Sequence, residues 1–197
     1  MQRRILLCAL AFAAGTFTLS GLIGPGVNSA QAQNAKQERD LENTLYLDLK
    51  DGRVTIELRP DLAPNHVARI KELTREGFYD GVVFHRVIDG FMAQTGDPTG
   101  TGRGGSDKPD LAAEFSDANH GRGAVSMARA QNPDSANSQF FIVFSDASFL
   151  DGQYTVWGQV VDGMEHVDAI KRGSQAANGA VDDPDKIIKM QVAADAQ

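Results

Sequence analysis

Two short segments of the chain carry the side chains that could do chemistry. The first, residues 84–97, contains Arg86 and Gln94. The second, residues 138–142, contains an amide and two phenyl rings. Neither segment holds a Gly-x-Ser-x-Gly nucleophile elbow, paired carboxylates or a cluster of metal ligands. These groups could bind an apolar moiety and polarise an amide, but they could not support acyl or phosphoryl transfer.

Arg86 is the candidate for catalysis. Its neighbours Phe84, Val87 and Ile88 indicate a strand, where a guanidinium is costly to desolvate unless it has a function. The alternative is an ion pair with a nearby acid. Beside an apolar pocket, a fixed guanidinium suits the binding of an Xaa-Pro segment. A donor aimed at the nitrogen of the twisted amide would lower the rotation barrier, which is about 18–20 kcal/mol without catalysis.

Other chemistries fit the sequence poorly. We expect no metal site and no cofactor, because the only cysteine is Cys8 and no i, i+4 pair occurs among the histidines, which are His66, His85, His120 and His166. His85 is interpreted as a structural hydrogen-bonding residue rather than a base. Residues 100–105 superficially resemble a phosphate-binding loop but lack the Gly-Lys-Ser/Thr ending, so we expect a surface loop there.

Residues 1–32 have the pattern of an export signal. Arg3 and Arg4 form a basic start, residues 5–14 are apolar, and a small-residue cleavage site follows at Ala30-Gln31-Ala32. We expect cleavage after Ala32, a periplasmic location and no stable membrane association afterwards. The alternatives are secretion, a twin-arginine route and an uncleaved membrane anchor.

The charge of the chain restricts its partners. The 197 residues carry a formal net charge of −7, and loss of the signal would remove two arginines and no acids. An acidic balance disfavours nucleic-acid binding, so we expect a solvated surface and no nucleic-acid partner. We also expect a monomer.

The remaining sequence divides into a polar tether, residues 33–43, and one domain, residues 44–197. Apolar residues alternate over 44–50 and again over 54–58, which predicts two strands. Asp51-Gly52 lies between them and predicts a hairpin with a two-residue type I′ turn.

The pattern after the hairpin predicts two helices and six further strands. One helix begins at Pro64 and ends before Gly77, and the other covers residues 164–172, with Val167 and Ile170 facing inward. Short apolar runs bounded by turns predict strands at 82–88, 91–94, 124–128, 139–144, 154–161 and 186–192. The predicted fold is mainly β, a closed eight-stranded antiparallel barrel capped by two α-helices.

The strand at 139–144 has two different faces. Alternation places Gln139, Phe141 and Val143 on one side and Phe140, Ile142 and Phe144 on the other. We expect the second set to fill the core and Phe141 to be exposed beside Gln139 on a binding surface. The alternative is that Phe141 lies under a loop.

The chain resembles the cyclophilin family of peptidyl-prolyl isomerases, and its bacterial branch in particular. The likeness runs from Thr44 to Val192 and rests on five motifs in family order: Phe84-His85-Arg86-Val87-Ile88, Gly90-Phe91-Met92-Ala93-Gln94-Thr95-Gly96-Asp97-Pro98, Ser126-Met127-Ala128-Arg129-Ala130, Ser138-Gln139-Phe140-Phe141-Ile142 and Leu150-Asp151-Gly152. The resemblance implies a barrel with the substrate groove on its outer surface.

The resemblance also implies roles for individual residues. Arg86 would act on the prolyl amide. The proline pocket would be formed by Phe91, Met92, Phe141 and Leu150. The peptide would be bound by the side chains of Gln94 and Gln139 and by the backbone around Ala128 and Arg129.

Three positions in the implied site depart from the better-known eukaryotic pattern. Arg129 stands where asparagine is usual, which matters less if that position acts through its backbone. Tyr154 replaces a histidine and keeps a polar tip. Phe149 replaces a tryptophan that helps to bind cyclosporin, so we expect weak cyclosporin binding.

The predicted function is a peptidyl-prolyl cis-trans isomerase acting on proline-containing polypeptides during the folding of exported proteins. The alternative is a proline-peptide-binding chaperone module with little or no turnover. A lipocalin-like carrier is excluded, because Phe140, Ile142 and Phe144 would fill the interior of the barrel.

Overall fold

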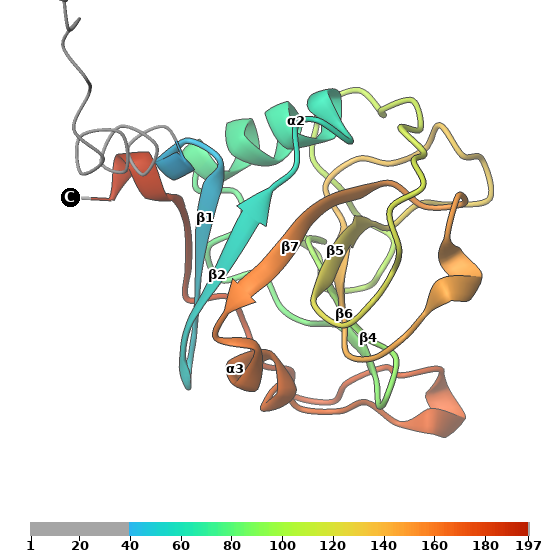
Figure 1. The fold of residues 1–197 in the computed structure, drawn as a ribbon. Coiled ribbons are helices and arrows are strands. Elements are labelled where there is room, and N and C mark those ends of the chain that lie inside the picture. The colour runs from blue at the N-terminus through green and yellow to red at the C-terminus, as the bar shows by residue number, and fades with distance from the viewer. Residues whose placement is uncertain (1–39, 197) are drawn as a thin grey trace, which may run out of the picture.

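The computed structural model describes residues 40–196, and the ribbon in Figure 1 is dominated by one curled sheet. The predicted export signal and residues 33–39 of the predicted tether lie outside the described residues. The eight strands are β1 (Thr44–Leu49), β2 (Gly52–Leu58), β3 (Arg86–Ile88), β4 (Met92–Thr95), β5 (Ala124–Met127), β6 (Phe140–Val143), β7 (Val156–Asp162) and β8 (Lys189–Val192).

The sheet is antiparallel throughout its ladder, in the order β3-β4-β6-β5-β7-β2-β1-β8. Its outer strands, β3 and β8, do not pair with each other, so a closed barrel is not confirmed. An isolated bridge between Val83 and Lys186 joins the segments that precede these two strands. The mainly β fold and its eight strands are confirmed.

Two helices and three short 3₁₀ turns complete the described chain. The helices are α2 (Pro64–Arg75) and α3 (Met164–Asp168), and α2 lies over one open end of the curled sheet in Figure 1. The 3₁₀ turns are η1 (Ser148–Leu150), η2 (Gln175–Ala177) and η3 (Ala193–Asp195). Within residues 40–196 no helix combines the length and the apolar character needed to cross a bilayer.

The opening hairpin forms as predicted, but its turn is one residue earlier. Leu49 pairs with Gly52, so the turn residues are Lys50 and Asp51, and Gly52 begins β2. The predicted Asp51-Gly52 type I′ turn is therefore wrong. The glycine meets a packing requirement instead, because a Cβ at this position would lie 2.3 Å from Nε2 of His166.

The first predicted helix is confirmed and the second is shorter than predicted. Pro64 occupies the first turn of α2, and Val67, Ile70 and Leu73 are buried along one face. Helix α3 ends at Asp168 rather than at residue 172. The backbone amides that follow it bond to other segments: Lys171 N–H donates to Asp185 and Gly173 N–H donates to the carbonyl of Val87.

The interior of the curled sheet is filled by large side chains. The ring of Phe140 packs edge-to-face against Tyr79 and Trp157, with centroids 5.6 and 5.4 Å apart, and Ile142 lies in the same cluster. A second, smaller cluster lies on the other face of β6 and contains Met92, Phe141, Val143, Leu150, Ala124 and Ala147. The predicted division of β6 into two faces is confirmed.

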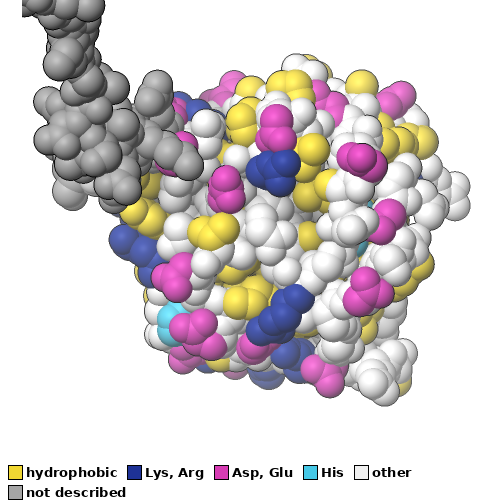
Figure 2. Space-filling model, in the orientation of Figure 1, with side chains coloured by type: hydrophobic (Ala, Val, Ile, Leu, Met, Phe, Trp, Pro, Cys, Tyr) yellow, Lys and Arg dark blue, Asp and Glu magenta, His cyan; other side chains and the backbone are white. Residues whose placement is uncertain are grey.

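The outer surface of the protein carries both signs of charge. On the face shown in Figure 2, acidic and basic side chains are interspersed rather than gathered by sign. Such a surface is typical of a soluble protein and offers no large basic patch on this face.

Candidate active site

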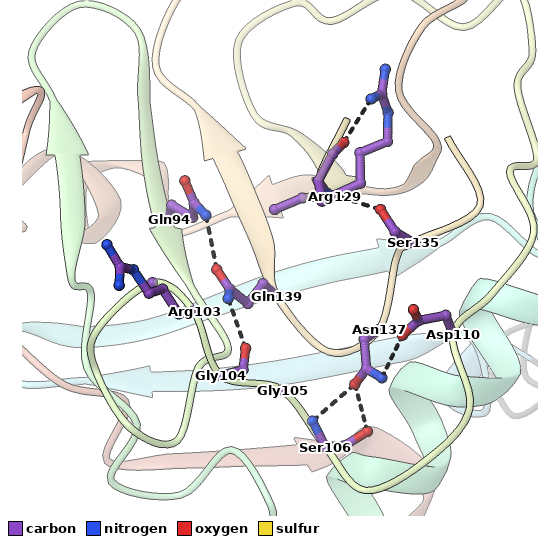
Figure 3. Close-up of a pocket in the computed structure, with 13 residues that line it drawn as sticks. Gln94, Arg103, Gly104, Gly105, Ser106, Asp110, Arg129, Ser135, Asn137 and Gln139 are labelled. Carbon is purple, nitrogen blue, oxygen red and sulfur yellow. Dashed lines mark hydrogen bonds between the residues drawn. The ribbon is translucent and has the colours of Figure 1, made fainter. Parts of the chain in front are cut away.

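Two adjoining cavities lie where the predicted site residues converge. The first, here called the apolar cavity, has a volume of about 470 Å³ and is lined by Arg86, Phe91, Met92, Gln94, Ala128, Arg129, Phe141, Phe149, Leu150 and Tyr154. These are ten of the eleven predicted site residues. The eleventh, Gln139, lines the second cavity, here called the polar cavity, whose volume is about 530 Å³ (Figure 3). Gln94, Ala128 and Arg129 line both cavities, so the two form one groove.

Strand register explains why residues far apart in the sequence meet here. Arg86 of β3 pairs with Gln94 of β4, and Gln94 pairs with Phe141 of β6. Paired residues on adjacent strands point to the same face of a sheet, so these three side chains form one row. Met92, two residues before Gln94, points the same way.

The floor of the apolar cavity is nearly closed to water. Phe141 is 5% exposed, so the prediction of an exposed ring is wrong. The ring is covered because Tyr154 packs edge-on against it, with centroids 5.9 Å apart, and Leu150 lies in the same cluster. Phe91 and Phe149 face each other at the rim, with centroids 5.4 Å apart, and Phe149 is 65% exposed.

Arg86 is held in one orientation at the wall of the apolar cavity. Its Nε donates to the carbonyl oxygen of Asn178 at 3.0 Å, and Nη2 donates to Oδ1 of the same asparagine at 3.2 Å. Nη1 donates to Oε1 of Gln94 at 3.1 Å. Among residues 40–196, no carboxylate lies within 4.0 Å of the guanidinium, so the alternative of an ion pair is not observed in this part of the chain.

The charge on Arg86 persists despite its surroundings. Burial lowers the pKa of Arg86, and the nearby Tyr154 phenol offsets part of this effect. An arginine guanidinium nevertheless stays protonated at neutral pH. The apolar cavity therefore has one fixed positive charge at its wall.

A chain of amides continues from Arg86 into the polar cavity. Gln94 accepts from Arg86 through Oε1, so its Nε2 donates onward to Oε1 of Gln139 at 2.9 Å. Nε2 of Gln139 then donates to the carbonyl of Gly104 at 2.8 Å, as Figure 3 shows. Both glutamine side chains are fixed by this chain of hydrogen bonds.

The loop that carries Gly104 is organised around a buried carboxylate. Asp97 is fully buried and accepts from the amide and hydroxyl of Thr99 and from the amides of Gly102 and Gly104. Burial raises the pKa of Asp97, but these hydrogen bonds outweigh it and lower the value to about 2. A Cβ at position 104 would lie 2.2 Å from Oδ1 of Asp97, so the close approach needs glycine.

His85 does not act as the structural hydrogen-bonding residue that we predicted. Neither ring nitrogen has a hydrogen-bond partner among residues 40–196, and the side chain lines neither cavity. Burial lowers the pKa of His85, with the Arg86 charge acting in the same direction and Asp97 against it. The ring is therefore neutral at physiological pH and fills space beside the loop.

A buried network beneath the apolar cavity was missed by sequence reasoning. His120 contacts Oδ1 of Asp151 through Nδ1 at 2.9 Å and Oγ of Ser126 through Nε2 at 3.1 Å. The hydroxyl of Ser126 donates to the carbonyl of Thr155 and is fully buried, so it is no nucleophile. The imidazole of His120 stacks on the ring of Phe141, with ring centroids 6.3 Å apart. The network therefore supports the floor of the apolar cavity.

Asn178 was also missed, although it makes two of the three hydrogen bonds to Arg86. The only signal in the sequence is the dipeptide Asn178-Gly179, which is typical of a turn and says nothing about what the turn contacts. Among residues 40–196, no group of three or more histidine, cysteine or acidic side chains is arranged to hold a metal ion.

Comparison with known sequences identifies close relatives. A family model described as cyclophilin type peptidyl-prolyl cis-trans isomerase/CLD matches residues 44–192. A probable peptidyl-prolyl cis-trans isomerase of Brucella suis is 54% identical over 197 residues, covering 94% of this chain and 99% of the relative. Peptidyl-prolyl cis-trans isomerase B of Bacillus subtilis is 44% identical over 66% of this chain and 92% of its own length.

Solved structures show the same architecture. The cyclophilin AquaCyp293 from Hirschia baltica matches with a TM-score of 0.72 at 28% identity, over 87% of this chain and 83% of its own. A cyclophilin-type isomerase of Cryptosporidium parvum, solved in the presence of the dipeptide Ala-Pro, matches with a TM-score of 0.69 at 29% identity, over 76% of this chain and 98% of its own. The eight strands, curled into a half-barrel with two helices, are thus a known arrangement.

Proposed function

Because this chain belongs to the cyclophilin-type peptidyl-prolyl cis-trans isomerases and is an isomerase of that class, we propose that Arg86 is the residue that stabilises the twisted prolyl amide. The observation that carries the proposal is the guanidinium of Arg86, fixed by Asn178 and Gln94 at the wall of an apolar cavity. No carboxylate of residues 40–196 neutralises it.

The apolar cavity suits the pyrrolidine ring of a substrate. Met92, Phe141 and Leu150 present a nearly dry floor, and a ring buried there removes its apolar surface from water. The presence of Ala-Pro with the Cryptosporidium relative supports a proline-containing ligand for this cavity. The backbone around Ala128 and Arg129, which lines both cavities, would pair with the peptide like an added strand.

The rate acceleration then follows from differential binding. Rotation removes amide resonance and leaves a pyramidal nitrogen that accepts a hydrogen bond better than the planar one. Arg86 binds that nitrogen most strongly at the top of the barrier, and each ~1.4 kcal/mol of preference gives about tenfold in rate. No proton transfer or covalent intermediate is required. The guanidinium needs no reorganisation, because its hydrogen bonds to Asn178 and Gln94 already fix it.

Substitution of Arg86 tests this mechanism. We expect Arg86→Ala to lower kcat/KM on a proline peptide about 100- to 1,000-fold, the loss typical of one preorganised donor. Peptide affinity, measured by calorimetry, should change far less, since the apolar floor stays intact. Arg86→Lys keeps the charge but loses the planar guanidinium. Its kcat/KM should therefore lie between that of the unsubstituted protein and that of Arg86→Ala.

The matched control is Arg122→Ala, which removes an exposed arginine paired with Asp168 and should leave turnover unchanged. Full turnover in Arg86→Ala would contradict the mechanism. The alternative function, a proline-peptide-binding chaperone module with little or no turnover, predicts little or no isomerase activity in the unsubstituted protein, and the same coupled assay tests it.

We further propose that the substrates are exported proteins in the course of folding. Residues 1–32 support this through their basic start, apolar run and Ala-Gln-Ala end. Uncatalysed Xaa-Pro isomerisation takes tens of seconds or longer and limits the folding of many chains. Mass spectrometry of the protein from the periplasmic fraction should give an N-terminus at Gln33. Recovery of the intact chain from the cytoplasm alone would exclude export.

A further inference from the structure

The arginines of the described chain fall into two groups. Nine lie within residues 40–196, and six of them have a carboxylate oxygen within 4.0 Å: Arg53, Arg59, Arg69, Arg75, Arg122 and Arg172. The other three, Arg86, Arg103 and Arg129, have none within this part of the chain. All three line the groove.

Each groove arginine has a different environment. Arg86 belongs to the apolar cavity and Arg103 to the polar cavity, while Arg129 borders both. The guanidinium of Arg129 donates to three backbone carbonyls and lies 4.5 Å from the ring centroid of Tyr154, so it is fixed but not neutralised. The guanidinium of Arg103 makes no hydrogen bond within residues 40–196, and the residue is exposed.

One acidic side chain also lines the polar cavity. Oδ1 of Asp110 accepts a hydrogen bond from Nδ2 of Asn137 at 3.0 Å. Figure 3 shows Asp110 beside Asn137 on the side of the cavity opposite Arg103, which lies next to Gln94. The Gln94 side of the polar cavity is therefore positive, in a protein whose net charge is −7.

The geometry of the apolar cavity indicates which part of a substrate reaches Arg103. The imide nitrogen lies at Arg86 in the proposed mechanism, and Gln94, which is bonded to Arg86, forms the boundary with the polar cavity. The residues joined to that nitrogen are those before the proline. They leave the apolar cavity past Gln94 and enter the polar cavity, where Arg103 stands at the near wall.

We propose that the polar cavity selects polypeptides with an acidic side chain within three residues before the proline, and that Arg103 is the residue that determines this preference. The proposal rests on the proposed function and adds a substrate class to it. A carboxylate entering the cavity finds a guanidinium whose donors have no other partner in the described chain. A lysine at the same place meets an uncompensated positive charge.

The size of the effect follows from the exposure of Arg103. An ion pair at an exposed site changes an affinity by about two- to fivefold, and salt weakens it. We therefore expect kcat/KM to be about two- to fivefold higher for a glutamate peptide than for its glutamine counterpart at low salt. The ratio should approach unity at high ionic strength.

The experiment uses three pairs of proline peptides, with Glu or Gln at the first, second or third position before the proline. The unsubstituted protein, Arg103→Gln and Arg103→Glu are compared in the same isomerase assay. We expect a preference for Glu at one or more positions in the unsubstituted protein. Arg103→Gln should abolish that preference and Arg103→Glu should reverse it, while Arg59→Gln, which removes an arginine paired with Asp61, should leave it unchanged.

The possible outcomes separate this proposal from the proposed function. Turnover of all peptides with no glutamate preference at any position overturns the role of Arg103 and leaves the isomerase function standing. A preference that survives in Arg103→Glu also overturns it, because another group must then bind the acid. Absence of turnover with every peptide contradicts both proposals.

Discussion

At the scale of single residues, the structure shows which contacts orient the candidate catalytic residue, Arg86. The sequence predicts Arg86 as the candidate catalytic residue, because its neighbours are apolar and burying a guanidinium among them costs free energy. The residue that orients it, Asn178, comes 92 positions later in a turn. No local pattern could have paired the two, because their contact depends on where η2 and β3 lie in the finished fold.

Asp97 is a second residue whose role depends on contacts that a pattern cannot show. Its folded pKa of about 2 lies below the value of about 3.9 expected in the unfolded chain. A lowered pKa stabilises the fold above pH 4, and that contribution is lost as the pH falls from about 4 to about 2. The shift corresponds to stability on the order of 2 kcal/mol.

We predict that Asp97→Asn lowers the free energy of unfolding at pH 7 and weakens its decline between pH 4 and pH 2. Urea titrations followed by fluorescence of Trp157, the only tryptophan, would measure both quantities. Asp107→Asn, an exposed change further along the same loop, is the control and should do neither. An unaltered pH dependence in Asp97→Asn would show that another group governs the acid transition.

At the scale of elements, the two faces of β6 have different roles. One face packs into the main core and the other forms part of the apolar cavity. Phe140 faces the main core and is fully buried, whereas Phe141 faces the apolar cavity. Alternation along the strand predicted this division from sequence. It could not predict how deeply Phe141 is covered, because the cover comes from Tyr154 and Leu150, whose segment has no regular period.

Alanine substitution of the two neighbours should therefore have opposite consequences. We predict that Phe140→Ala costs about 3–5 kcal/mol of stability, since it empties a well-packed site between Tyr79 and Trp157. Turnover per folded molecule should be nearly unchanged. Phe141→Ala should cost less stability, because its cavity opens to water, but should reduce kcat/KM at least tenfold. Equal effects of the two changes on turnover would contradict this assignment of faces.

Three predicted elements differ clearly from the structure: the helix at 164–172, the hairpin turn, and the strand at 82–88, of which only Arg86–Ile88 is a strand. Beyond the end of α3 the amide of Lys171 bonds to Asp185, and beside the hairpin turn Gly52 lies against the ring of His166. Apolar periodicity places a strand or helix within a few residues but carries no information about such partners. The number of strands and their approximate positions, which depend on alternation and turns, were predictable, whereas the order in which distant strands pair was not.

At the scale of the whole molecule, the order of the sheet divides the protein into two halves. The groove is built on β3, β4, β6 and β5, at one side of the order. Residues 40–43 lead into β1 and residues 193–196 follow β8, the two strands at the other end of this order. Arg75 of α2 binds both Glu42 and Asp195, which fixes the two ends of the described chain beside each other (Figure 1).

This division has a practical meaning for anything attached to the protein. A bead or a second folded module attached at residue 40 or at residue 196 would be joined next to β1 and β8, which contribute no residue to the groove. Since Glu42 and Asp195 both bind Arg75, residues 40–196 suit a circular permutant, in which a short linker joins the ends of this segment and new ends open in a distant loop. Attachment at these positions therefore replaces no residue of the groove.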